Sequence, residues 1–271
     1  MSKASGSDLG QVQLCIDGQV AHVVLSHPGK LNAMSRAMWR QLREVFEGLQ
    51  DNPMLRCVVL RGEGGHFCAG GDISEYPAFR FDEPQLRHFH EVEVWGGLQA
   101  MLACDLPLVA HIEGNCMGAG LEIASCCDIR LASPNTKFGA PIAKLGFPMA
   151  PREAALVLSQ LGATLTRQVL LEAAVFEAPA LYASGFLSAL LPVNSDSEVE
   201  RRVARLCALA PQAARLNKQT FRTLNRLNPD DPGLTASELI ASMLAQAYTY
   251  ANSHEHREGI DAFLNKRTPA F

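Results

Sequence analysis

The chain has 271 residues, enough for one large domain that buries roughly three quarters of its unfolded surface without a disulfide or metal staple. Hydrophobic residues make up 48% and charged residues 19%, a globular composition that excludes a mainly disordered or collagen-like chain. The net charge of −4, from 24 basic and 28 acidic residues, gives no positive excess for binding nucleic acid or acidic membranes. We therefore expect a folded protein with neither nucleic-acid nor membrane partners.

The cysteine pattern and the N-terminal segment predict a cytoplasmic protein. The eight cysteines show no CxxC spacing, so free thiols in a reducing compartment are expected. Residues 1–10 are polar and lack the apolar stretch of a secretory signal, and we expect a disordered leader there. No uninterrupted apolar run approaches the ~20 residues of a membrane span.

The first expected elements are a hairpin and a helix. Apolar and polar residues alternate over 11–16, a β-branched run covers 20–25, and Asp17-Gly18 between them favours a tight turn. Ser35 is a suitable N-cap for a helix that keeps apolar residues at helical spacing as far as residue 49. The sequence therefore predicts a β-hairpin followed by an amphipathic helix.

Three short apolar runs predict strands in the interior of a sheet. They cover residues 55–60, 107–112 and 128–132 and alternate little, as in strands that are covered on both faces. A helix is predicted between the first two, over residues 83–104. Because strands and helices alternate up to about residue 145, the sequence predicts an α/β layer structure.

The rest of the sequence predicts helices. A boundary near residue 195 divides an α/β core, 11–195, from a helical C-terminal region, 196–271, which we expect to pack on the core or on a partner subunit. Helical spacing and caps predict helices over residues 152–161, 164–174, 179–184, 199–209, 216–224, 235–251 and 256–266.

Two glycine clusters each follow a predicted buried strand. The first, 62–73, is either a loop that presents consecutive backbone N–H groups or an ordinary flexible turn. The second, 113–122, opens an apolar helix, where free N–H groups and the positive end of the helix dipole meet. It has neither the Gly-Lys-Ser/Thr of a P-loop nor the dinucleotide pattern, but it suits a developing oxyanion. Glu122, in the first turn of this helix, fits either a dipole-stabilising carboxylate or a catalytic one.

Together these segments resemble the enoyl-CoA hydratase/isomerase family, also called the crotonase superfamily. The resemblance runs from about residue 12 to 267 and implies an α/β fold, a crotonase-like spiral of ββα turns. It also implies that the helical C-terminal region assembles the chain into trimers, or into hexamers built as dimers of trimers. The matching segments are 28–33 (PGKLNA), 66–73 (HFCAGGDI), 114–122 (GNCMGAGLE), 127–130 (CDIR), 138–141 (FGAP) and 253–260 (SHEHREGI).

The resemblance implies an acyl-CoA substrate whose thioester oxygen is held by two backbone N–H groups, those of Ala69 and Ala119, while an enolate forms. Hydratases of the family use two glutamates. Glu122 matches one of them, but Ile142 stands at the second position, directly after FGAP. Enoyl-CoA hydration or isomerisation with Glu122 as acid/base is therefore the first hypothesis. Decarboxylation, thioester hydrolysis, C–C cleavage and non-catalytic CoA binding are the alternatives.

For the CoA portion, the resemblance implies that Lys30 meets phosphates and that the backbone of 69–73 lines the adenine pocket. Phe263 and Lys266 either pack on adenine and pair with phosphate, or belong to an ordinary amphipathic terminal helix. No cofactor is expected apart from the CoA of the substrate. The implied substrate- and CoA-binding residues are Lys30, Leu31, Ala69, Gly71, Asp72, Ile73, Met117, Gly118, Pro141, Ile142, Phe263 and Lys266.

Other titratable residues are candidate acid–base or metal-binding groups. Glu75 and Tyr76 follow the first glycine loop and either reach an acyl pocket or begin a solvated helix. His88 and His90 lie on the helix expected to cover the acyl group. Since they are two residues apart they diverge on a helix, and no HExxH or Cys/His set is present, so no metal site is expected.

Overall fold

The computed structural model describes residues 10–50, 52–192, 196–225 and 236–271. Apart from Gly10, the expected leader lies outside the described residues. The predicted hairpin is confirmed: β1 (Gln11–Asp17) pairs antiparallel with β2 (Val20–Ser26), and Gly18 in the turn has the positive φ of +54° that glycine allows. None of the eight cysteines is paired in a disulfide in this structure.

A six-stranded sheet forms the centre of the molecule, in the order β1-β2-β3-β4-β6-β9. From β2 onward all neighbours are parallel. The three predicted interior strands are confirmed, and their uniform apolarity has its reason in packing on both faces. The added strands are β3 (Cys57–Gly62), β4 (Leu108–Ile112), β6 (Ile129–Ala132) and β9 (Ala189–Leu190).

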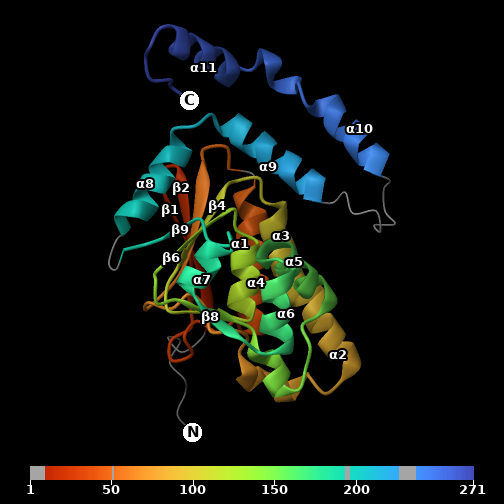
Figure 1. Ribbon diagram of the computed structural model, residues 1–271. Helices are drawn as coiled ribbons and strands as arrows, with labels where there is room; N and C mark the ends of the chain where they lie inside the picture. The colour runs from red at the N-terminus through yellow and green to blue at the C-terminus, as the bar shows by residue number, and fades with distance from the viewer. Residues whose placement is uncertain (1–9, 51, 193–195, 226–235) are drawn as a thin grey trace.

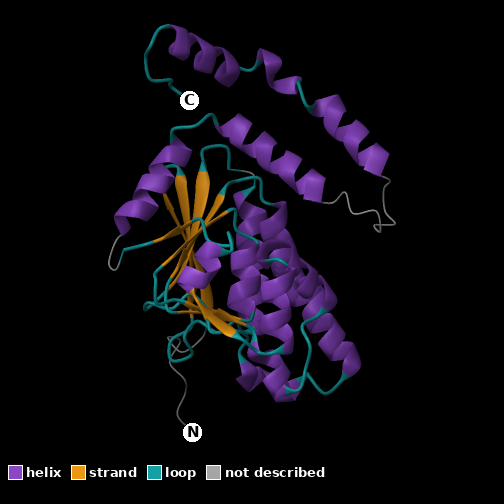
Figure 2. Ribbon diagram, in the orientation of Figure 1, coloured by secondary structure: helices purple, strands orange, loops and turns teal. Residues whose placement is uncertain are grey.

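The helices of the α/β core gather on one side of this sheet (Figure 2). Ser35 caps α1 (Arg36–Leu49) by accepting a hydrogen bond from the Met38 N–H, as predicted. The helix predicted over 83–104 contains a π-helical segment in its middle. The remaining bounds are η1 (Ile73–Ala78), α2 (Glu83–His88), the π-helical η2 (Phe89–Val94), α3 (Trp95–Ala103), α4 (Ala119–Ser125), η3 (Pro141–Leu145), α5 (Pro151–Leu161), α6 (Ala163–Leu171) and α7 (Ala178–Ala183).

A second, smaller sheet was not foreseen in the sequence. Its strands are β5 (Asn115–Met117), β7 (Lys137–Gly139) and β8 (Val175–Glu177), in the order β5-β7-β8. Three residues are too few for a period of two to be visible, so no strand pattern marks them. This sheet matters for the site, because β5 runs through the second glycine cluster.

The C-terminal helices lie in two different places (Figure 1). α8 (Asp196–Cys207) covers the other face of the large sheet, where Val199 packs with Val59, Val109 and Leu131, so sheet packing continues beyond residue 195. α9 (Pro211–Asn225) is tied to the core by an ion pair between Lys218 and Asp128 at 2.8 Å. Farther out lie α10 (Ala236–Gln246), η4 (Thr249–Asn252) and α11 (His254–Leu264).

Candidate active site

The two glycine clusters form one continuous wall. The Cys68 N–H donates to the Asn115 carbonyl at 2.8 Å, and the Met117 N–H donates to the Cys68 carbonyl at 2.9 Å. Gly120 permits this approach: a Cβ on it would lie 2.6 Å from the carbonyl oxygen of Cys68. The close position of the first cluster therefore requires a glycine at 120. Because residues of the first cluster are hydrogen-bonded to the second, residues 62–73 are not an ordinary flexible turn.

Asn32 fixes the first loop from behind. Its side-chain oxygen accepts from the His27 N–H at 3.0 Å, and its side-chain nitrogen donates to the carbonyls of Glu63 at 2.8 Å and His66 at 2.7 Å. His66 in turn accepts, at Nδ1, from the backbone N–H of Asn115 at 3.3 Å. The segment around Asn32 thus has a structural role: it ties the two glycine clusters to the end of β2.

The donor in the first loop differs from the expected one. The N–H of Ala69 is already donated to the Leu31 carbonyl at 3.0 Å, so Ala69 is not the free donor that the resemblance implied. Gly70, with φ of +117°, turns the chain directly after it. Met34 pairs with the two neighbours of Gly71: its N–H donates to the Gly70 carbonyl, and its carbonyl accepts from the Asp72 N–H. The N–H of Gly71 itself therefore points away from Met34.

The N–H groups of Gly71 and Ala119 are among those without an acceptor in the described residues at this point. Ala119 is the first residue of α4, where N–H groups have no partner inside the helix. Both residues line the same pocket. Both donors are main-chain groups, so their presence does not depend on the side chain at either position.

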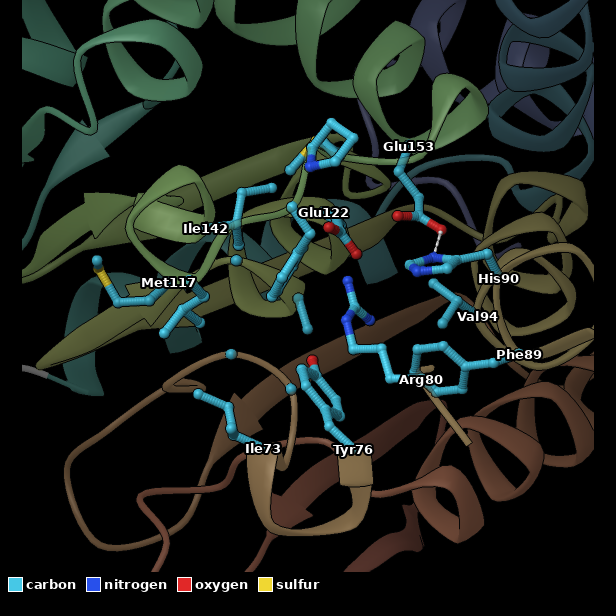
Figure 3. A pocket seen from close by; sticks show the side chains of 18 of the residues that line it. Ile73, Tyr76, Arg80, Phe89, His90, Val94, Met117, Glu122, Ile142 and Glu153 are labelled. Atoms are coloured by element: carbon cyan, nitrogen blue, oxygen red, sulfur yellow. Dashed lines mark hydrogen bonds and ion pairs between the residues drawn. The ribbon is translucent and has the colours of Figure 1, made fainter. Parts of the chain in front are cut away.

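Glu122 projects from the first turn of α4 into this pocket and is only 7% exposed (Figure 3). Burial, with a further contribution from the charge of Glu153, raises the pKa of Glu122 well above its ordinary value. Its carboxyl group makes no hydrogen bond or ion pair within the part of the chain that the structure describes. A buried carboxyl with a raised pKa and a free oxygen is suited to proton transfer.

A second carboxylate lies in the pocket, at a position that sequence reasoning missed. Ile142 is in η3 and lines the pocket, as its place after FGAP implied. The carboxylate comes instead from Glu153, in the first turn of α5, which is 3% exposed. His90, from η2, donates from Nδ1 to Glu153 Oε1 at 2.8 Å (Figure 3). In sequence, Glu153 follows Pro151 and has the pattern of any helix start, so only the fold identifies it.

Two more polar side chains line the pocket, Tyr76 and Arg80. Burial raises the pKa of Tyr76 to about 12, so its phenol is neutral at physiological pH. The Arg80 guanidinium lies 3.6 Å from the ring centroid of Phe147 and 4.6 Å from that of Tyr76. Glu75, the neighbouring candidate, instead accepts from the backbone N–H of Arg36 at 2.8 Å.

Only some of the predicted substrate- and CoA-binding residues line the pocket. Lys30 lies outside the pocket lining and pairs with Asp72 at 2.6 Å, which lowers the pKa of that carboxyl against the opposing effect of burial. Phe263 and Lys266, at the end of the chain, are also outside it, and their roles stay predictions. The predicted residues that do line the pocket are Ala69, Gly71, Ile73, Met117, Gly118, Ala119, Glu122, Pro141 and Ile142.

A crotonase-like α/β fold with a buried carboxyl beside two free N–H groups defines the class of protein. The sequence model of the enoyl-CoA hydratase/isomerase family matches residues 16–271, and the chain belongs to this family. It is 31% identical over 214 residues to a probable enoyl-CoA hydratase of Mycobacterium tuberculosis, covering 78% of this chain and 81% of that protein. It is 27% identical over 254 residues to the 2,3-dehydroadipyl-CoA hydratase of Escherichia coli, covering 93% and 95%.

Solved structures agree with this fold. The crystal structure of an enoyl-CoA hydratase/carnitine racemase from Magnetospirillum magneticum superposes with a TM-score of 0.88 at 33% identity, covering 96% of this chain and 94% of that one. Within the described residues, no helix is long and apolar enough to cross a bilayer. The same residues contain no group of three or more histidine, cysteine, aspartate or glutamate side chains placed to hold a metal ion.

Proposed function

We propose that this protein is an enzyme that acts on acyl-CoA thioesters through an enolate, with Glu122 as the acid/base. The observation that carries the proposal is the Glu122 carboxyl, free and buried in the same pocket as the unpaired N–H groups of Gly71 and Ala119. When a proton leaves Cα, or water adds at Cβ, negative charge develops on the thioester oxygen. Two fixed N–H donors in a dry pocket stabilise that charge.

Hydration is the reaction that we favour. It needs one group to take a proton from water as its oxygen bonds to Cβ, and a proton delivered to Cα. Glu122 and Glu153 are both buried and both line the pocket, so the missing glutamate at position 142 has a substitute from α5. His90 holds Glu153 in one orientation. Isomerisation, which moves one proton between two carbons, is the second candidate and needs Glu122 alone.

Assembly and CoA binding complete the proposal. Phe263 is 83% exposed on α11, and Ile260 and Leu264 on the same helix are exposed as well. An apolar helix face in water favours a covering by another copy of the chain. We propose a homotrimer, or a hexamer of two trimers, with Lys30, Phe263 and Lys266 meeting the CoA of the same or a neighbouring subunit. A cytoplasmic location stays part of this proposal.

The test follows the hydration of crotonyl-CoA and the isomerisation of 3-enoyl-CoA with the wild type and with Glu122→Gln and Glu153→Gln. Loss of a general acid/base predicts a fall in kcat/KM of about 10²- to 10⁴-fold for Glu122→Gln. Glu153→Gln should impair hydration more than isomerisation. Glu83→Gln is the matched control, since Glu83 is on the surface of α2 and pairs with Arg87.

Full activity of Glu122→Gln would overturn the assignment of this residue. If neither substrate reacts, a panel of malonyl-type, 3-oxoacyl and 3-hydroxyacyl CoA esters separates the other reactions of the family from hydration. Binding of acetoacetyl-CoA in a calorimeter, without turnover of any ester in the panel, would support a non-catalytic CoA-binding protein and overturn the enzyme.

A further inference from the structure

The guanidinium of Arg80 is a charged group of the pocket that the proposed reaction does not use. Its Nη1 is buried and has no hydrogen-bond partner. Among the described residues, no carboxylate lies within ion-pair distance of any of its nitrogens, and its neighbours are the rings of Tyr76 and Phe147. An unpartnered buried donor is costly, so a ligand is expected to satisfy it.

Arg130 is a buried arginine with a structural role, and it serves as a comparison for Arg80. Its side chain is also buried, and the guanidinium donates to the carbonyls of Phe186 at 2.6 Å, Ala124 at 3.4 Å and Cys127. It therefore has backbone partners on more than one edge. Arg80 has none of these bonds, although it too is partly withdrawn from water. The difference indicates that Arg80 is placed for something other than holding the chain.

The side chain of Arg80 is held in place and points into the cavity. The rings of Tyr76 and Phe147 lie against the guanidinium, and Nη1 stays without a hydrogen-bond partner. Figure 3 shows the guanidinium reaching from the Tyr76 side toward the end of the pocket where Glu122 lies. A guanidinium that is fixed in this way needs little further ordering when it binds a planar anion with two parallel hydrogen bonds.

The charges around Arg80 also favour an anion. Burial lowers the pKa of Arg80, yet an arginine in a protein keeps its proton. Glu153 acts in the opposite direction and raises the pKa of Arg80, but its hydrogen bond goes to His90, and Tyr76 is neutral. Arg80 therefore carries its charge into a largely apolar pocket without a carboxylate at ion-pair distance among the described residues.

We propose that Arg80 binds a carboxylate carried by the acyl group, so that the preferred substrates are CoA monothioesters of dicarboxylic acids. This inference rests on the proposed function, because it takes the pocket as the acyl pocket. The thioester oxygen does not satisfy Arg80 in this arrangement, since it is held by the N–H groups of Gly71 and Ala119. The CoA phosphates do not reach it either, since the pantetheine arm separates them from the acyl carbons.

The test is calorimetric binding of saturated esters, which the hydration reaction cannot consume. Succinyl-, glutaryl- and adipyl-CoA are each compared with the monocarboxylic acyl-CoA of equal length and with the methyl ester of the free carboxyl group. For at least one length, the wild type should bind the dicarboxylic ester about tenfold more tightly, or more, than both neutral probes. Arg80→Met should remove this ratio, and Arg80→Lys, which keeps the charge without the planar fork, should keep only part of it.

The possible outcomes distinguish a failure of this inference from a failure of the proposed function. If the wild type binds neutral acyl-CoA but prefers no dicarboxylic ester, this inference is wrong and the proposed function stands. If it binds no acyl-CoA at all, the proposed function fails. An equal loss of affinity for neutral and anionic esters in Arg80→Met would show a structural role and overturn the inference. Arg87→Met, which changes an exposed arginine of α2, is the control, and if Arg80→Met does not fold, the wild-type comparison with the methyl esters decides.

Discussion

Glu122 is a carboxyl group that the fold keeps from water. Burial raises its pKa above the ordinary value, so the folded state holds this proton to higher pH than the unfolded state does. The stability contributed by the protonated form is fully present below the unfolded pKa and is lost as the pH rises through the folded pKa. The buried carboxyl of Glu122 therefore lowers the stability of the fold as the pH rises.

The first prediction follows from the raised pKa of Glu122. The stability of Glu122→Gln relative to the wild type should increase as the pH rises from about 4 toward 8, because glutamine has no proton to lose. Urea unfolding at a series of pH values measures the difference. A difference that is constant with pH, or that moves in favour of the wild type, would contradict the raised pKa.

Gly120 gives a second prediction at the level of one residue. In a helix, changing glycine to alanine ordinarily adds up to about 1 kcal/mol of stability. Gly120→Ala should instead destabilise by on the order of 1–3 kcal/mol, since its Cβ would lie 2.6 Å from the Cys68 carbonyl oxygen. Gly48→Ala in α1, where a Cβ meets nothing within 4 Å, is the matched control and should be neutral or stabilising. Chemical unfolding that shows the same sign for both variants would refute the close approach.

Among the elements, α1 offers the clearest test of a cap. The Ser35 hydroxyl accepts from the Met38 N–H, and this helix supplies Trp39 to the pocket lining. Ser35→Ala should lower the free energy of unfolding by about 1 kcal/mol, and Ser35→Asp should keep most of it. Equal stability of the alanine variant and the wild type would show that the cap contributes nothing.

The elements also show which features a sequence reveals. The hairpin, the interior strands and α1 were predicted because each has a local pattern: a turn pair, an apolar run or a cap. The strands of the small sheet have three residues each and leave no pattern. The π-helical segment inside 83–104 was also missed, because its apolar residues fit an α-helix nearly as well.

The site residues also divide into those that a sequence motif reveals and those that only the fold reveals. Glu122 was predicted because it lies inside a glycine motif at a helix start. The donor was misassigned to Ala69 because only the turn at Gly70 decides which N–H is free. Glu153 and Arg80 belong to segments without a motif. They meet Glu122 only because α5 and the segment after η1 converge on the pocket, and that convergence is tertiary information.

At the scale of the whole molecule, α10 and α11 lie outside the core, and α11 exposes apolar side chains. We predict that light scattering will give three or six times the chain mass of 29.4 kDa. Phe263→Glu should lower that mass by placing a charge on the apolar face of α11. Phe81→Glu, at a residue that is 89% exposed on the core, is the control. A monomeric wild type would contradict the proposed assembly.

The wall made by the two glycine clusters has a consequence for divergence within the family. Its contacts are main-chain bonds between residues near Cys68 and residues near Met117, and its two free donors are main-chain groups. Most side chains on either loop can therefore be substituted without moving the donors. A glycine that contacts backbone, such as Gly120, cannot be substituted in this way. Substitutions across the pocket can then change what enters it while the two glycine loops keep their positions.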